Sequence, residues 1–152
     1  MLLTPHIFLG LFFIAKFRPE VAVSAALVSH FLFDYFLPHW NPHLFTEMKK
    51  NGALSQKTKL IIAADVLVSV ISVLVFMSLA LPNLTQAFYI GLTALFAVLP
   101  DLIEAPFYLL KLNGIFRKFV EFEHKNQATA GPLWGNVSQA LVIIVCLLGM
   151  LS

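Results

Sequence analysis

Three of the five histidines, together with Asp34, lie in the stretch Ser29–His43, SHFLFDYFLPHWNPH, which closes an apolar run near the start of the chain. His30 and Asp34 are four residues apart, so on a helix both side chains lie on one face. Pro38 ends that helix, and the two remaining histidines of the stretch follow in turn-rich sequence. Ionisable groups near the end of a membrane-length apolar segment are costly, which makes this stretch a candidate site.

Imidazole and carboxylate groups together form the ligand sets of zinc, manganese and non-haem iron sites. Asp101 and Glu104 form a second pair with helical spacing, and Asp65 lies inside a long apolar segment. A central Asp costs about 2.5–3.5 kcal/mol on insertion scales, so Asp65 is expected to be a ligand or to orient a ligand histidine. The sequence therefore predicts a divalent-metal site, zinc first and manganese or iron as alternatives, with these candidate ligands: His6, His30, Asp34, Asp65 and Asp101.

Glu104 and His124 are the candidates for general acid and base catalysis. A divalent ion at this depth would activate water next to the phosphate and ester groups of phospholipids. The sharpest hypothesis from the sequence is therefore an enzyme that hydrolyses a lipid or a lipid-linked phosphate or ester, with membrane lipids as its partners.

Each of these features also has a structural alternative. The pair His30 and Asp34 can be a satisfied hydrogen-bonded pair, and Asp65 can bind a polar partner in a neighbouring span. Two other classes of function stay open. One is a small ion- or proton-coupled transporter or channel subunit, with a relay through these residues. The other is a non-catalytic scaffold or lipid-binding protein, in which the polar cluster only holds helices together.

The composition is that of an integral membrane protein. Of 152 residues, 59% are hydrophobic and 12% are charged, and the mean hydropathy is +0.86, whereas a soluble domain is about half apolar and a quarter charged. The formal net charge of +2 gives no argument for nucleic acid. The single cysteine, Cys146, rules out a disulfide framework and a cysteine-built zinc site.

The apolar segments predict an all-α, polytopic bundle of about five transmembrane or re-entrant helices in a single membrane-embedded domain, residues 1–152. These segments are Leu2–Phe17, Glu20–Leu37, Leu60–Leu81, Gln86–Leu99 and Gly131–Ser152. The first is shorter than the roughly 20 residues that a full span needs, so it is either a thin span or a half-inserted arm. The fourth is broken at Pro100-Asp101, and a kinked extension along the membrane interface is expected to follow.

Five crossings would place the N-terminus and the two long polar connections, 38–59 and 111–130, on one side of the membrane. That side would hold all 10 lysine and arginine residues except Lys16 and Arg18, so the positive-inside rule makes it cytoplasmic. The candidate site residues map to the same side. The sequence thus predicts a site at the cytoplasmic leaflet and leaves the oligomeric state open.

Several of these motifs resemble a known family. The motif SHFLFDYFLPHW, Ser29–Trp40, resembles the Ser-His-x-x-x-Asp helix end of the YdjM-like family, small bacterial membrane proteins classed as membrane-bound metal-dependent hydrolases. Thr4-Pro5-His6 followed by Gly10 resembles the N-terminal histidine motif of that family, and Pro100-Asp101 resembles its Pro-Asp motif. The resemblance implies a multi-pass protein of a bacterial-type inner (plasma) membrane with these metal ligands: His6, His30, Asp34 and Asp101.

The family also carries a His-Arg pair followed by a Thr-His pair. The nearest stretch in this chain is His124 with Asn126, Gln127 and Thr129, and it lacks the arginine.

Overall fold

The computed structural model describes the whole chain, residues 1–152, as eight α-helices with no β-strand. The expectation of an all-helical protein is therefore confirmed. The helices are α1 (Leu3–Lys16), α2 (Pro19–Phe36), α3 (Leu44–Asn51), α4 (Gln56–Leu79), α5 (Leu84–Ala97), α6 (Leu99–Leu110), α7 (Ile115–Asn126) and α8 (Pro132–Leu151).

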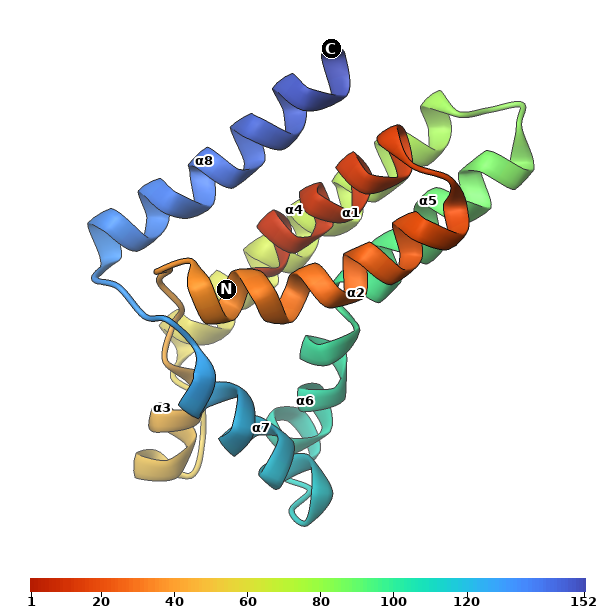
Figure 1. The fold of residues 1–152 in the computed structure, drawn as a ribbon. Helices are drawn as coiled ribbons and strands as arrows, with labels where there is room; N and C mark the ends of the chain where they lie inside the picture. The colour runs from red at the N-terminus through yellow and green to blue at the C-terminus, as the bar shows by residue number, and fades with distance from the viewer.

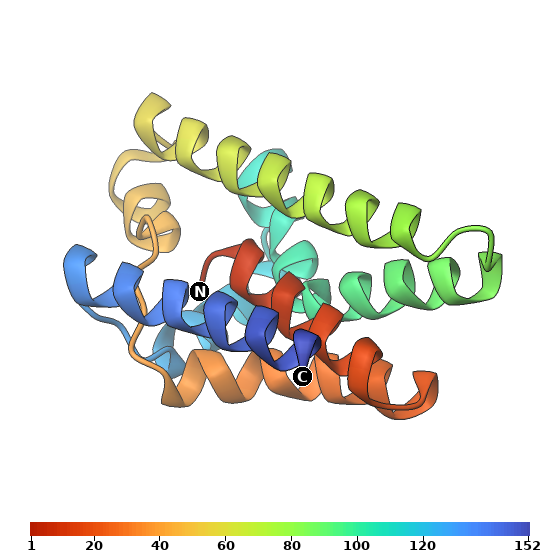
Figure 2. The same cartoon turned by 90° about the horizontal axis from the view of Figure 1, so that it is seen from above.

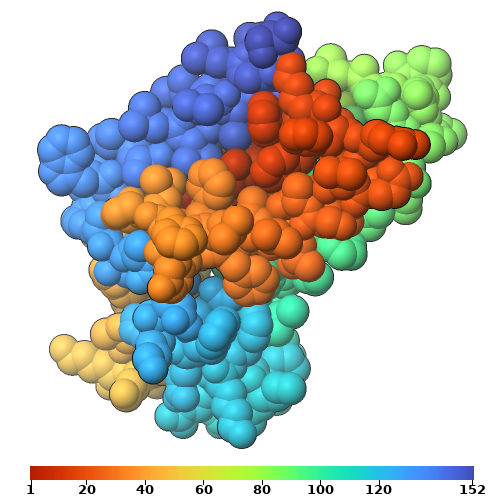
Figure 3. Space-filling view, in the orientation of Figure 1, coloured from red at the N-terminus to blue at the C-terminus, as the bar shows by residue number.

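The helices form two layers. The bundle consists of α1, α2, α4, α5 and α8, and α1 lies at its centre, in contact with the other four (Figures 1 and 2). The end layer consists of α3, α6 and α7, which lie beneath one end of the bundle. Figure 3 shows the end layer projecting below the bundle and in contact with it. The N-terminus lies at the end of the bundle that meets this layer, and the C-terminus lies at the opposite end (Figure 1).

A close approach between α1 and α5 holds the centre of the bundle together. Gly10 of α1 sits so near α5 that a methyl group in its place would lie 3.1 Å from Ala97 Cβ and 3.2 Å from the Thr93 carbonyl oxygen. The absence of a side chain at Gly10 therefore allows the two helices to approach this closely. Around this point the two helices bury one apolar cluster: Ile7, Leu11, Ile90, Ala94 and Val98.

Two helices, α4 with 24 residues and α8 with 20, are long and apolar enough to cross a membrane. The pair α5 and α6 would count as a third span, bent by 57°. The bend lies at Val98, two residues before the predicted Pro100-Asp101 break. By contrast, α1 has 14 residues, about 21 Å at 1.5 Å per residue, which is shorter than a hydrocarbon core of about 30 Å. Large apolar side chains are exposed along the bundle, as expected for helices in contact with lipid.

Both polar connections contain helices that the sequence pattern did not predict. α3 lies in 38–59 and α7 lies in 111–130. Each is amphipathic, with one apolar face turned into the end layer, where Met48, Phe107 and Val120 form a small core. The opposite face of each helix is polar and solvated. Neither helix therefore forms a continuous apolar segment, which is the pattern that predicts the helices of the bundle.

Candidate metal centre

The end of the bundle and the end layer meet at a buried cluster of histidines and carboxylates. The first turns of α1 carry His6, and the last two turns of α2 carry His30 and Asp34. These three residues are 1%, 1% and 2% exposed. Asp101 comes from the first turn of α6, and Glu123 comes from the buried face of α7. Two consecutive helices near the start of the chain and two near residues 99–126 thus bring their polar groups to one place.

The two buried imidazole rings are in direct contact. The ring centroids of His6 and His30 are 3.9 Å apart, and the planes are tilted by 20°. His6 Nε2 lies 3.2 Å from Asp34 Oδ1 without forming a hydrogen bond. His30 Nδ1 lies 2.8 Å from the Ala97 carbonyl oxygen and 4.0 Å from Asp101 Oδ2.

Two overlapping groups of residues could hold a metal ion. The first is His6, His30 and Asp101, and the second is His30, Asp34 and Glu123. Within each group, one ligand atom from every residue lies within 4.8 Å of the others. Four of the five predicted ligand residues belong to these groups, Asp65 does not, and Glu123 is an addition.

Several atoms of this cluster are buried and have no hydrogen-bond partner. They are His6 Nδ1 and Nε2, His39 Nε2, Asp101 Oδ2 and Glu123 Oε1. Burial of an unpaired polar group costs free energy, so such atoms are rare and their gathering at one place needs an explanation. The donor set is that of zinc, manganese and non-haem iron sites. The residues present therefore fit a divalent metal ion.

Hydrogen bonds to the backbone orient two of the histidines. A proton on His30 Nδ1 is donated to the Ala97 carbonyl oxygen at 2.8 Å, and one on His39 Nδ1 is donated to the Leu37 carbonyl oxygen at 2.9 Å. In both rings this leaves Nε2 free to bind a metal. Histidines that bind metals commonly hold their second nitrogen in this way.

His39 was not among the predicted ligands, although the structure places it at the cluster. It is fully buried, and its Nε2 lies 4.0 Å from Asp34 Oδ1. A short backbone pairing with the segment before α8 holds it there: the His39 amide donates to the Ala128 carbonyl oxygen, and the Ala130 amide donates to the His39 carbonyl oxygen. Burial lowers the pKa of His39, which favours the neutral ring that binds metals.

Glu123 is the second residue at the cluster that was not among the predicted ligands. It lies in the polar connection 111–130, but it is only 5% exposed. Burial raises the pKa of its carboxyl group to about 7. A signal was present in the sequence, because Phe116, Val120 and Glu123 recur at the spacing of one helical face, so the carboxylate lies on an apolar stripe.

Asp34 already has a cationic partner in the structure. The Met1 amino group lies 2.9 Å from both Asp34 Oδ1 and Asp34 Oδ2. An ion that takes Asp34 as a ligand must therefore compete with this ammonium group. The group formed by His6, His30 and Asp101 does not have this competition.

Asp65, predicted as a ligand or as a support for one, belongs to neither group. Its carboxylate instead binds the start of α1 from α4: Oδ2 accepts from the Leu3 amide at 2.6 Å, and Oδ1 accepts from the Thr4 hydroxyl at 2.6 Å and the Thr4 amide at 3.2 Å. No capping side chain at the start of α1 fulfils this role. These are the contacts of a helix cap supplied by another helix, and the metal role of Asp65 stays a prediction.

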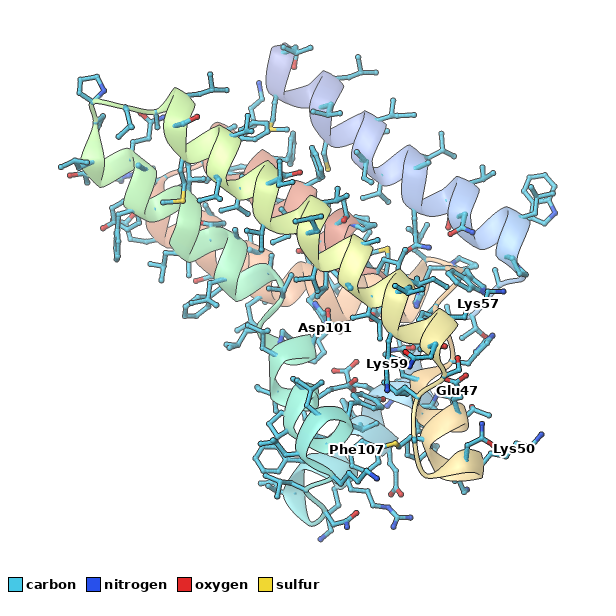
Figure 4. The ribbon with its side chains drawn as sticks, turned by 180° about the vertical axis from the view of Figure 1, so that it is seen from behind. Glu47, Lys50, Lys57, Lys59, Asp101 and Phe107 are labelled. Carbon is cyan, nitrogen blue, oxygen red and sulfur yellow. The ribbon has the colours of Figure 1, made fainter.

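Glu104 and His124, the predicted acid and base, lie beside the cluster. Both line a cavity of about 310 Å³ that also contains Asp101. Of the 20 residues that line this cavity, 13 are hydrophobic, including Ile62 and Val66 of α4. Figure 4 shows Asp101 near the junction of α5 and α6. Asp101 therefore connects the buried cluster to a largely apolar cavity.

None of the protein-family models, curated proteins or solved structures compared with this chain matches it.

Proposed function

We propose that this chain is a membrane-embedded, metal-dependent hydrolase that acts on a lipid or a lipid-linked phosphate or ester. The observation that carries the proposal is the set of unpartnered, buried nitrogen and oxygen atoms at the meeting point of α1, α2, α6 and α7. Unpaired imidazole nitrogens and carboxylate oxygens at one buried place are best explained as ligands of a cation.

His6, His30 and Asp101 would hold the ion. Asp34 and Glu123 of the second group would complete the site, together with His39, which lies beside Asp34. Zinc fits this donor set, and manganese or iron would fit it as well. An ion bound there would supply Lewis acidity toward a phosphoryl or carbonyl oxygen and would activate water as a nucleophile.

The cavity next to the cluster supports a lipid as the substrate. Its apolar walls suit an acyl chain, and three of its polar residues, Asp101, Glu104 and His124, suit a reacting headgroup. In this mechanism Glu104 and His124 exchange protons with the attacking water and with the leaving oxygen. Because Glu104 and His124 come from two different helices of the end layer, packing of α6 against α7 positions both relative to the bound lipid.

We further propose a multi-pass placement in a bacterial-type inner membrane, in which all five bundle helices cross or enter the bilayer. The end layer would then lie at the cytoplasmic leaflet, since it and the adjacent start of α4 carry all of the lysines and arginines except Lys16 and Arg18. This placement puts the cavity at the depth of lipid headgroups.

Elemental analysis of the full chain, purified in detergent, tests the metal site directly. We expect near-stoichiometric zinc, manganese or iron in the wild type, and its loss in His30→Gln and Asp101→Asn. His43→Gln is the matched control, because His43 is an exposed histidine outside the cluster. A folded wild type that holds no metal, even after metal is added back, would overturn the proposal. Metal-loaded protein would then be assayed against phospholipids and lipid phosphates.

A further inference from the structure

A second hollow lies in the end layer, apart from the metal centre. It has a volume of about 350 Å³ and lies among α3, α6 and α7. Its apolar side is formed by Phe45, Met48 and Phe107, and Figure 4 shows Phe107 on the side of α6 that faces α3. Only Phe45 also lines the cavity beside the metal centre.

The charged residues around this hollow all have one sign. Lys49, Lys111 and Arg117 are among its 8 lining residues, which include no carboxylate. The three come from three different elements: the last turn of α3, the residue that ends α6, and the first turn of α7. All three are exposed, so a ligand from the solvent or from a membrane surface has access to them.

Arg117 keeps donors available for such a ligand. Its Nε donates to Glu121 Oε1 at 2.9 Å, which is one helical turn further along α7. That bond leaves both terminal nitrogens of the guanidinium free for another acceptor. Phosphate oxygens are the acceptors that a guanidinium fork binds best.

The start of α7 adds to the positive potential. No side chain caps this helix, and its first turn contains no acidic residue. Instead, Arg117 and Lys118 lie in that turn, where the positive end of the helix dipole disfavours cations. An anion bound at this end would be stabilised both by the free amides and by the cations.

We infer that the hollow bounded by Lys49, Lys111 and Arg117 binds a phosphate group, carried either by an anionic lipid headgroup or by a soluble phosphate compound. The site is separate from the metal centre in its residues and does not depend on the proposed hydrolase activity. Its apolar side, Phe45 and Phe107, would contact the carbon atoms attached to the phosphate.

Two triple variants of the full chain in neutral detergent test this site. The hollow variant is K49Q/K111Q/R117Q. The matched control is K50Q/K118Q/K125Q, whose residues do not line the hollow, and Figure 4 shows Lys50 on the outer side of α3. Each variant removes three positive charges, which changes the formal net charge from +2 to −1 (2 − 3 = −1). Any difference in ligand affinity between the two variants therefore reflects where the charges were removed, and not the total charge of the chain.

Isothermal titration calorimetry would measure binding of short-chain phosphatidylglycerol and, separately, of inorganic phosphate. We expect the hollow variant to lose about tenfold or more in affinity for the ligand that binds, and the control to stay within about twofold of the wild type. Binding of phosphatidylglycerol alone identifies a lipid headgroup, and binding of inorganic phosphate as well identifies the phosphate group itself. Equal affinities in the two variants, or no binding of either ligand to the wild type, would overturn the inference.

Discussion

His6 and His30 stack ring on ring, with centroids 3.9 Å apart, although one side chain comes from the first turns of α1 and the other from the end of α2. Two imidazolium rings at this distance would repel each other strongly in a buried site. The stack is therefore compatible with two neutral rings, which is the form in which histidine binds a metal ion.

Replacing His6 by Phe separates packing from ligation. Phe keeps an aromatic ring against His30 but removes two nitrogens that have no hydrogen-bond partner, so stability should change little. Loss of a residue that only supports a metal ligand typically lowers metal affinity by roughly 10–100-fold, so loss of His6, a proposed ligand, should lower it by at least that much. Competition with a chelator measures the affinity, and thermal unfolding of the metal-free protein in detergent measures the stability. His6→Ala, which loses both ring and nitrogens, should lower both quantities.

Removal of the Asp65 carboxylate should affect the fold more than the metal. In Asp65→Ala the Leu3 and Thr4 amides lose their acceptor, which should lower the free energy of unfolding by about 0.5–2 kcal/mol, the usual cost of losing a cap. Metal content per folded chain should stay unchanged. Denaturant titration in mixed micelles and elemental analysis give the two readouts. Loss of metal from a folded Asp65→Ala protein would instead show that Asp65 acts at the metal centre.

Metal affinity should rise with pH through the neutral range. Burial raises the pKa of Glu123 from its ordinary 4.5 to about 7, so below that pH an ion must displace a proton before it binds this carboxylate. This group alone should weaken binding by about tenfold for each pH unit below about 7. Chelator competition between pH 5.5 and 8 would show the trend, and Glu123→Gln should flatten it.

The same shift predicts the opposite trend for stability without metal. Between pH 4.5 and about 7 the folded chain holds a proton on Glu123 that the unfolded chain has already released. The free energy of unfolding of the metal-free protein should therefore fall as the pH rises through this window. If metal-free wild type and Glu123→Gln lose stability in parallel across it, Glu123 is not the group responsible.

Glu104 and His124 should affect turnover without affecting metal content. Both line the cavity beside Asp101 but belong to neither ligand group. Loss of a general acid or base typically costs 10²–10⁴-fold in rate, so Glu104→Gln and His124→Gln should each slow hydrolysis of the lipid substrate by roughly that factor. Glu121→Gln, on the exposed face of α7, is the control and should keep full activity.

The sequence was informative about the bundle because a long, mostly apolar run marks each of its helices. The five apolar segments correspond to α1, α2, α4, α5 and α8, with ends that agree to within a few residues for four of them. The fifth, α4, extends back to Gln56, because a polar first turn, capped by Ser55, carries no hydropathy signal. For the same reason α3 and α7 were not predicted, because their apolar faces are narrow and the rest of each helix is polar.

The contents of the cluster could be predicted only in part. His30 and Asp34 could be predicted because they are four residues apart in the sequence. His6 and Asp101 could be predicted because each lies near the end of an apolar segment. His39 was not, because its position depends on a backbone pairing with Ala128 and Ala130, about 90 residues away in the chain. Local patterns do not encode such a contact.

The bend between α5 and α6 passes through the metal centre itself. His30 Nδ1 is held by the carbonyl oxygen of Ala97, the last residue of α5, and lies 4.0 Å from Asp101, in the first turn of α6. A change in the 57° angle between these helices therefore changes the separation of two ligand residues. An ion bound by both His30 and Asp101 would therefore resist a change in this angle, and a ligand that alters the angle would alter the affinity of the site for the ion.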